Sequence, residues 1–478
     1  NVYVSEKFIP LIGDIYDYVK EMKAGRAFYM SRISDAPKIK DADLRLRFEG
    51  TDPTLVLNSN KAIEEFLKLQ PTKIDRVSIE KGIYKAGKHA FLFKGSSKNT
   101  IARRKLLTRE LSLNHSSRFI PSIVQITLDI IDEFQPGKEY NFVDSGNLLT
   151  FNAFTTILFG EDLVDLANGT RMYKNPDGTI EELPLRDFMI KTFKAYYAQL
   201  LNPITNMFKF ISDYNLMNPY IRDDENFRVL LEAMRELFDK AKDPNSVCQR
   251  ILGSQEVNME DKFNDIIAFI LAGAETSSHG IVSTMFLLKK NPHTLKKLQE
   301  ELASNGINEE YLRAGKFNIE DLQGLEYLNF VVKESLRVDN PAPEAFAYAP
   351  STDIEICGVP IPKGMLVRTE IHGAHYNENY WLRPKMFEPE RFNPESDFFK
   401  EATKAGKIAN SFSKRSFGVG IRNCPGQILA VLELKIAAIV FAVCCDYNIK
   451  DELLNGEGVG FGIGSEIPCL FTVNKILI

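Results

Sequence analysis

The chain has 478 residues, of which 44% are hydrophobic and 26% are charged, and its formal net charge is −5. This composition is typical of a globular protein with a large core, and the acidic balance gives no indication of nucleic-acid binding. Six cysteines are scattered without a C-x-x-C pair, at Cys248, Cys357, Cys424, Cys444, Cys445 and Cys469. Their spacing argues against a disulfide framework or a zinc site and favours a reducing compartment.

The first half of the chain alternates short strands and helices. Residues 46–58 predict two short strands around a turn at 51–53, and residues 61–69 have a helical period. Residues 82–100 read as a loop-like insert with exposed aromatics. Two further helices are predicted at 143–160 and 225–242, with a turn-rich segment at 173–182 between them.

The second half contains the longest apolar segments. Residues 261–290 predict a long apolar helix, and residues 353–369 predict short strands around glycines. The apolar run 436–445 is ten residues long, too short to cross a membrane, and predicts a core helix. The fold is therefore expected to be mainly α, with a small β region from distant segments, in one domain covering residues 1–478.

One cysteine precedes this last helix in the stretch Phe417-Gly-Val-Gly-Ile-Arg-Asn-Cys-Pro-Gly426. The positive end of a helix favours the ionised form of Cys424, and Pro425 suits the first helical position. No histidine or second cysteine lies nearby, which excludes a locally built tetrahedral metal site. A single thiolate facing a flat ligand fits haem; the alternative is a buried structural thiol.

The neighbours of Cys424 have matching properties. Gly420 gives the backbone freedom for a tight turn, and Gly426 lets a flat ligand approach the chain. Arg422 can pair with an acid group on that ligand.

The stretch closely resembles the haem-binding signature of the cytochrome P-450 family. Five positions stand as F-x-x-G-x-R-x-C-x-G, and two more follow at fitting offsets: Phe417, Gly420, Arg422, Cys424, Gly426, Ala430 and Glu433. The resemblance implies that Cys424 is the axial ligand of the haem iron and that the other signature residues surround the cofactor. It also implies a triangular helical prism, with haem between the long central helix and the helix after the cysteine loop.

A second segment, A-G-A-E-T-S at 272–277, resembles the family's oxygen-binding signature. Gly273 and the Thr276 hydroxyl can open a notch in the helix for O₂ and water, with Ala272 facing the cofactor. Glu275 beside Thr276 can relay protons. The alternative is that Glu275 faces solvent and Thr276 only bonds back to its own helix.

A third match concerns structure. Glu334 and Arg337 resemble the family's E-x-x-R, and Arg391 lies in a segment that resembles P-E-R-F. The resemblance implies a buried Glu–Arg–Arg cluster that supports the cysteine loop and has no catalytic role. On its own, an i, i+3 pair of this kind is common on solvated helices.

The arginines expected to meet the haem propionates depart partly from the family. Arg104 takes the arginine position of W-x-x-x-R, but Thr100 stands at the tryptophan position, and Arg103 is the alternative arginine. Where many relatives carry a further arginine, this chain has Tyr348. Anchoring is therefore expected to depend on Arg422 and Arg104.

The resemblance covers essentially the whole chain and implies monooxygenation. The enzyme would use haem b to insert one oxygen atom of O₂ into a hydrophobic small molecule. The residues expected to line the substrate pocket are Phe269, Gly273, Phe93, Phe346 and Phe461. Taken singly, each such residue is more often an ordinary core residue than a substrate contact.

Electrons would come from NADPH through a flavoprotein reductase, with cytochrome b5 as a second donor, because the chain has no flavin or nicotinamide fingerprint. A basic stretch is the expected docking patch, although a solvated lysine-rich loop would look the same: Lys400, Lys404, Lys407, Lys414, Arg415 and Arg422.

The matches begin near residues 10–15, which resemble the hinge after a membrane anchor, in the style of the eukaryotic microsomal branch. We expect the natural protein to lie at the endoplasmic reticulum membrane, facing the cytosol, through an anchor before Asn1. Without that anchor the chain is expected to be soluble and monomeric. The alternatives are a haem-thiolate isomerase or dehydratase that needs no O₂, a non-catalytic haem protein, and a helical scaffold without haem.

Overall fold

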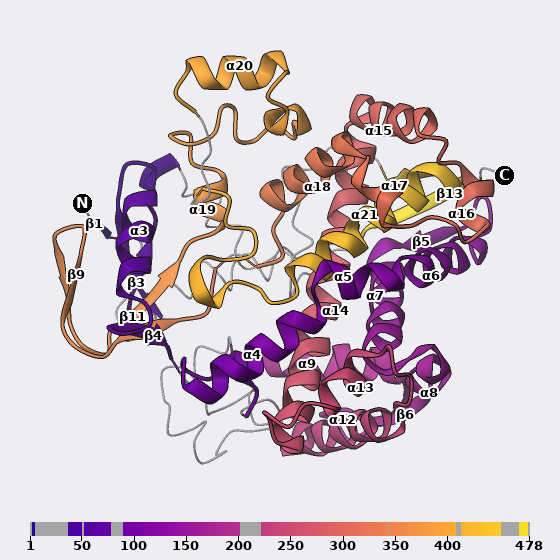
Figure 1. The fold of residues 1–478 in the computed structure, drawn as a ribbon, viewed down its shortest axis with the longest axis horizontal. Helices are drawn as coiled ribbons and strands as arrows, with labels where there is room; N and C mark the ends of the chain where they lie inside the picture. Colours follow the sequence, from indigo (N-terminus) through magenta and orange to yellow (C-terminus); the bar gives the residue numbers. More distant parts are fainter. Residues whose placement is uncertain are drawn as a thin grey trace.

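The computed structural model describes residues 2–4, 37–49, 52–77, 89–200, 221–342, 344–407, 413–450 and 468–476. Figure 1 shows a large helical part on one side and the strands of the largest sheet, with α3 (Asn60–Leu69), on the other. This division into a mainly helical body and a small β region agrees with the predicted fold class.

The longest helix is α14 (Met259–Lys290), which runs through the helical part (Figure 1). It begins two residues before the predicted 261, because the Asn258 side chain accepts a hydrogen bond from the Asp261 N–H. Glu260 and Asp261 lie in the first turn and Lys289 and Lys290 in the last, as the helix dipole favours.

Four helices have the most extensive contacts with α14: α7 (Phe142–Phe159), α15 (Pro292–Ser304), α18 (Glu326–Val338) and α21 (Gln427–Cys444). Small residues let two of them approach closely. A Cβ on Gly146 of α7 would lie 2.8 Å from Ser278 Oγ, and one on Gly280 of α14 would lie 3.1 Å from a Leu434 methyl group. Because α7 and α21 pack closely against α14, this helix can form a rigid wall for a site beside it.

The other helices among the described residues surround these five. They are α4 (Lys98–Glu110), α5 (Leu113–Ser116), α6 (Ile120–Asp132), α8 (Val164–Ala167), α9 (Leu185–Leu200), α12 (Ile221–Lys240), α13 (Val247–Leu252), α16 (Glu309–Arg313), α17 (Ile319–Gln323), α19 (His372–His375) and α20 (Asp397–Lys404). Short 3₁₀ helices are η2 (Phe91–Phe93), η3 (Ser117–Phe119), η4 (Glu161–Leu163), η5 (Pro389–Phe392) and η6 (Gly420–Arg422). The predicted helices at 61–69, 143–160 and 225–242 are confirmed as α3, α7 and α12.

The largest sheet has the order β1-β2-β3-β11-β8-β4. Its strands are β1 (Val2–Val4), β2 (Leu44–Glu49), β3 (Asp52–Leu57), β4 (Ile74–Arg76), β8 (Tyr348–Pro350) and β11 (Leu366–Thr369). β2 and β3 are the two strands predicted around 51–53. At the opposite edge β4 pairs antiparallel with β8, and Arg76 stands opposite Tyr348. The sheet packs on α3 through a separate apolar cluster.

The described residues also form three smaller sheets: β9 (Ile354–Ile356) with β10 (Val359–Ile361), β12 (Cys445–Ile449) with β13 (Leu470–Ile476) and β5 (Glu139–Asn141), and β6 (Thr170–Lys174) with β7 (Ile180–Pro184). The last pair corrects the prediction of a turn-rich segment at 173–182. The turn is the tip of a hairpin, where Gly178 has φ of 93°, and its flanks pair as strands.

Within the described ranges, two helices, α14 and α21, are long and apolar enough to cross a membrane. Their most apolar 18-residue windows are 72% and 67% buried inside the fold. α21 includes most of the run 436–445, so the prediction of a core helix there is confirmed.

Candidate functional site

A cavity with about 1340 Å³ of empty space, part of it open to solvent, lies beside α14. Its wall comes from α14, the loop that carries η2, α4, the segment after α18, and the loop between α20 and α21. The lining is mostly apolar, with a few charged side chains and one cysteine. A mostly apolar cavity with a few converging charged groups has the character of a ligand or cofactor site.

The cysteine in this wall is Cys424, whose thiol is exposed to the cavity. Its backbone N–H donates to the Phe417 carbonyl at 2.8 Å, which closes the loop just before α21 begins. Burial raises the pKa of the Cys424 thiol, whereas hydrogen bonds from the Gly426 and Gln427 N–H groups and the charge on Arg104 lower it. Donors of this kind at a helix N-terminus stabilise a thiolate ligand.

Glycines give the loop its shape. Gly418 and Gly420 have φ of 74° and 73°, a conformation that other residues rarely adopt. A Cβ on Gly420 would lie 2.5 Å from a Leu67 methyl group. At Gly426 a Cβ would lie 3.1 Å from the Phe269 ring, and both residues line the cavity with Phe417.

Three guanidinium groups line the same cavity. Arg104 donates to the carbonyl and side-chain oxygens of Asn423, each at 2.7 Å. Arg422 donates to the carbonyls of Phe91 and Lys94 at 2.9 and 3.0 Å. The third, Arg76 of β4, was not predicted, because nothing in a three-residue strand marks it.

None of these three arginines forms an ion pair within the described ranges, and the Nε atoms of Arg76 and Arg422 are buried without a hydrogen-bond partner. Burial lowers the pKa of Arg104, and it lowers that of Arg422 to about 10; the charge on Arg76 lowers both. Uncompensated cations beside a cavity favour an anionic ligand. The donor set, a thiol and three guanidiniums around a large cavity, therefore fits haem with its two propionates.

Arg103 lies elsewhere and has other partners. Its Nε donates to Asp265 at 2.8 Å, and its Nη1 lies 3.0 Å from Asp261. Asp265 also accepts a bond from the Phe91 N–H, so this pair ties α4 and the η2 loop to α14. Arg104 is therefore the arginine of the two that lines the cavity.

The wall from α14 contains Phe269, Ala272, Gly273 and Thr276. The helix stays α-helical through this segment, and the Thr276 hydroxyl donates to the Ala272 carbonyl at 2.8 Å. A Cβ on Gly273 would overlap the ring of Phe154 from α7. Gly273 thus allows α7 and α14 to approach beside the cavity, a role that its position in the sequence did not reveal.

Glu275 lies on another face of α14. It lines a small separate cavity with Arg186, Asn147 and Thr150, and it is not among the residues that line the large cavity. The side chains of Glu275 and Thr276 therefore lie at different cavities.

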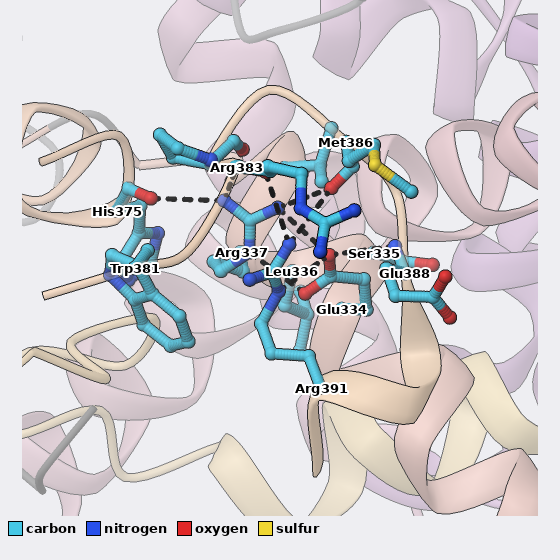
Figure 2. Close-up of polar contacts among 12 residues, drawn as sticks. Glu334, Ser335, Leu336, Arg337, His375, Trp381, Arg383, Met386, Glu388 and Arg391 are labelled. Atoms are coloured by element: carbon cyan, nitrogen blue, oxygen red, sulfur yellow. Dashed lines mark hydrogen bonds and ion pairs between the residues drawn. The ribbon is translucent and has the colours of Figure 1, made fainter. Parts of the chain in front are cut away.

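Figure 2 shows Glu334 held between two arginines. Arg337 binds both carboxylate oxygens at 2.8 Å, and the Arg391 Nε lies 3.1 Å from Oε1. Arg337 also donates to the carbonyls of His375, Pro384 and Met386. The cluster is buried and joins α18 to α19 and η5, next to the segment that leads to the cysteine loop.

That segment is anchored by Arg415, which is fully buried. Its side chain donates to the Glu370 and Asn58 carbonyls at 2.8 and 3.1 Å, and its N–H donates to His375 Nε2. Arg415 and Arg422 are therefore not part of a basic surface, and the predicted patch is corrected to its lysines. Lys400, Lys404 and Lys414 are exposed.

The predicted wall residues divide into three groups. Phe269, Gly273 and Phe346 line the cavity, while Phe93 packs edge-to-face on Phe346 at 5.9 Å between ring centroids. Phe461 lies outside the described residues, as does the hinge at 10–15.

A buried acid lies behind the cavity wall. Glu433 of α21 has no exposed surface, and within the described part of the chain neither carboxyl oxygen has a hydrogen bond of normal geometry. Burial raises the pKa of Glu433 to about 8, and the neighbouring Ser277 hydroxyl partly offsets this effect. The acid is therefore mostly neutral at pH 7 in the folded protein.

This raised pKa predicts a stability that falls with pH. Between pH 4.5 and about 8 the unfolded chain ionises Glu433 while the folded chain does not, so folding is progressively penalised. Glu433→Gln should gain stability over the wild type by up to about 1.4 kcal/mol per pH unit in this window. Thermal unfolding at pH 5 and pH 8 measures this pH-dependent gain in stability, and a Glu326→Gln variant, changed at an exposed position, is the control. A difference from wild type that does not change with pH would contradict the assignment.

Known relatives match this chain over different lengths. "Cytochrome P450 71B31" from Arabidopsis thaliana is 29% identical over 55% of this chain and 50% of its own length. "Cytochrome P450 3A18" from Rattus norvegicus is 30% identical over 61% of this chain and 59% of its own. "Cytochrome P450 71B5" from Arabidopsis thaliana is 25% identical over 91% and 86%. The chain thus matches about half to three-fifths of the first two relatives. The family model described as Cytochrome P450 matches residues 43–441, and the chain therefore belongs to the cytochrome P450 family.

Proposed function

We propose that this chain is a haem-thiolate monooxygenase that acts on a hydrophobic small molecule, with residues 1–478 forming one catalytic domain. The observation that carries the proposal is that Cys424 and three guanidinium groups, none of them ion-paired with a described residue, line the same mostly apolar cavity. Family membership supports it, because the cytochrome P450 family binds haem b and uses O₂ with electrons from NADPH through a reductase.

Each signature residue has a proposed role toward the cofactor. The Cys424 thiolate would bind the iron, with the N–H groups of Gly426 and Gln427 stabilising its charge. Arg422 and Arg104 would hold the propionates. Phe417, Gly426 and Ala272 line the cavity and would shape the space for the macrocycle, whereas Gly420, packed on Leu67, would shape the loop that carries Cys424. When bound, haem supplies the activation of O₂.

The protein's own contribution is orientation and control of water. The Phe269, Phe346 and Ala272 side chains line the cavity, so an apolar substrate gains free energy by leaving water there. Glu344 also lines the cavity, but Arg47 binds its carboxylate and Arg368 lies 3.9 Å away. Its charge is therefore compensated, which supports a hydrophobic substrate class.

Thr276 is the proposed group for holding and passing a proton at the cavity. Its hydroxyl donates to the Ala272 carbonyl and lies in the wall, so it can accept from a water in the cavity at the same time. Glu275 would provide the proton from the second cavity, through a change of its rotamer.

Thr276→Val should preserve shape while removing the hydroxyl. We expect product formed per NADPH consumed to fall on the order of 100-fold, with hydrogen peroxide appearing instead, because proton delivery is lost. Thr276→Ser should retain most of the coupling. The ratio of product to NADPH measures it, and a Val variant that stays fully coupled would show that Thr276 is a wall residue only.

The electron donor would be an NADPH-dependent flavoprotein reductase, with cytochrome b5 as a second donor. The exposed Lys400, Lys404 and Lys414 remain candidates for docking an acidic partner. Raising salt from about 0.05 to 0.5 M should slow reductase-driven reduction several-fold by screening. Reduction by dithionite serves as the control, since it needs no docking, and a salt-independent reductase rate would reject the patch.

The direct test is product formation from a panel of apolar compounds with NADPH and reductase. Turnover that requires O₂ supports a monooxygenase, whereas turnover without O₂ and NADPH supports the isomerase or dehydratase. A chain that binds haem and transforms none of the compounds supports a haem-binding protein. The endoplasmic reticulum membrane, with the domain facing the cytosol, is the proposed location, and the monomer is the proposed state.

A further inference from the structure

A buried polar cluster joins α14 to the end of α18 behind the cavity wall. Its centre is Asp339, whose side chain is 1% exposed. The Ser283 hydroxyl donates to Asp339 Oδ2 at 2.6 Å, and Nε2 of His279 lies 3.2 Å from the same oxygen. His279 and Ser283 are four residues apart on α14, so one face of that helix holds the carboxylate.

The Asp339 carboxylate is ionised at neutral pH in the folded protein. Burial raises the pKa of Asp339, but the charge and hydrogen bond of His279, the Ser283 hydroxyl and the charge of His372 together hold it below its ordinary value. Apolar side chains would join two helices without burying a charge, so a contact of this kind contributes a defined geometry.

Asp339 is also the point where the chain leaves α18 and enters the cavity wall. It is the first residue after that helix, and residues 340–342 line the cavity directly after it. On the other side of the contact, Gly280 is next to His279 in the sequence and lines the same cavity. The carboxylate therefore lies behind the corner where these two walls meet.

Asn340 extends the connection to the segment before the cysteine loop. Its side chain donates to the Leu336 and Ser416 carbonyls, each at 3.1 Å. Its Oδ1 accepts the Ala342 N–H at 3.0 Å, and its own N–H donates to His372 Nε2 at 3.2 Å. Ser416 lines the cavity as well, so three wall segments are joined by one polar network.

We propose that Asp339 is a positioning residue for substrate selection, which holds residues 340–342 at a fixed distance from α14 and so sets the width of the cavity. The inference rests on the proposed function. Asp339 is not among the residues that line the cavity, so it acts through the wall segment that follows it. Ligands that fill the corner between residues 340–342 and Gly280 should depend on Asp339, whereas smaller ligands should not.

The test compares imidazole with the bulkier 1-phenylimidazole, two ligands of haem iron, by titrating the absorption spectrum of the haem-loaded protein. Asp339→Asn keeps the size of the side chain and removes its charge. It should weaken 1-phenylimidazole binding about tenfold, because the wall is no longer held in one position. Imidazole is too small to span the iron and this wall, so its affinity should change less than about twofold.

Two hydroxyls on α14 provide a matched pair of variants. Ser283→Ala removes a donor to Asp339 and should weaken 1-phenylimidazole binding about threefold. Thr284→Val is the control, because the Thr284 hydroxyl is also buried but donates to the Gly280 carbonyl of its own helix. It should leave both affinities unchanged.

A double variant tests the contact itself. His279→Gln and Asp339→Asn together should weaken binding no more than the more damaging of the two single changes, since neither partner is then left beside an unmatched charge. Additive losses would show that the two side chains act separately and would overturn their pairing.

Hydrogen–deuterium exchange gives a readout that needs no ligand. The Asn340 and Ala342 amides should exchange faster in Asp339→Asn than in the wild type, while those of α15 stay unchanged as the internal reference. Circular dichroism checks that each variant is folded. If Asp339→Asn is not, Ser283→Ala takes its place with the same criteria.

An unchanged ratio of the two azole affinities in the folded variant would overturn the role in substrate selection. Unchanged exchange at Asn340 and Ala342 would overturn the claim that Asp339 fixes the wall. A wild type that binds no haem would instead overturn the proposed function, and the exchange result would still decide whether Asp339 holds this segment.

Discussion

Replacing Cys424 with Ala is expected to reduce reductase-driven turnover to background. The Cys424 thiol lies in the cavity wall, and the N–H groups of Gly426 and Gln427 point at its sulfur. No neighbouring group in the described wall offers a second sulfur or an imidazole to replace it. Product formation with NADPH and reductase measures the effect.

The matched control is Cys445→Ala, which removes a buried thiol far from the cavity wall in β12. It should alter stability slightly and leave turnover per bound haem unchanged. Retained turnover in Cys424→Ala, or an equal loss in both variants, would show that Cys424 has only a packing role.

The second large effect is expected for stability. Arg337→Leu should lower the free energy of unfolding by about 3–5 kcal/mol, because it leaves the Glu334 carboxylate buried with one guanidinium instead of two. The carbonyls of His375 and Pro384 lose their donor as well, and that of Met386 keeps only Arg391. The midpoint of denaturant unfolding measures the loss.

Arg313→Leu is the control for this variant. Arg313 pairs with Asp132 and Glu309 near the surface, where its own side chain is partly exposed, so the cost should stay below about 2 kcal/mol. If the two variants lose the same stability, the buried cluster contributes no more than a surface pair does.

The sequence predicted the parts of the site that depend on local patterns. The glycines, the proline and the cysteine of the loop before α21 share one short stretch, and their backbone requirements can be read there. The apolar period of α14 likewise extends over many turns. Such features need no knowledge of distant contacts.

Contacts between distant segments were not predictable in the same way. Arg76 comes from a three-residue strand and meets Arg422 only because β4 pairs with β8 beside the cavity. Phe154 of α7 fills the space above Gly273, and a buried histidine, His375, accepts the Arg415 N–H. No spacing of residues in the sequence indicates these contacts.

Burial also reversed the interpretation of two charged residues. Arg415 and Arg422 lie in a run of basic residues, which favours a surface patch, yet both bind backbone carbonyls inside the fold. Charge counts cannot distinguish the two cases, because an arginine satisfied by carbonyls looks like any other in sequence. The raised pKa of Glu433 could not be predicted from the sequence either, because it follows from burial of the side chain between α14 and α21.

The central claim is that Cys424 is a thiolate ligand of haem. The most direct measurement is the absorption spectrum of the haem-loaded, reduced protein under carbon monoxide, recorded for the wild type and for Cys424→Ala. We predict the red-shifted Soret band of thiolate ligation in the wild type and its loss in the variant. A wild type without that band, or a variant that keeps it, would contradict the claim.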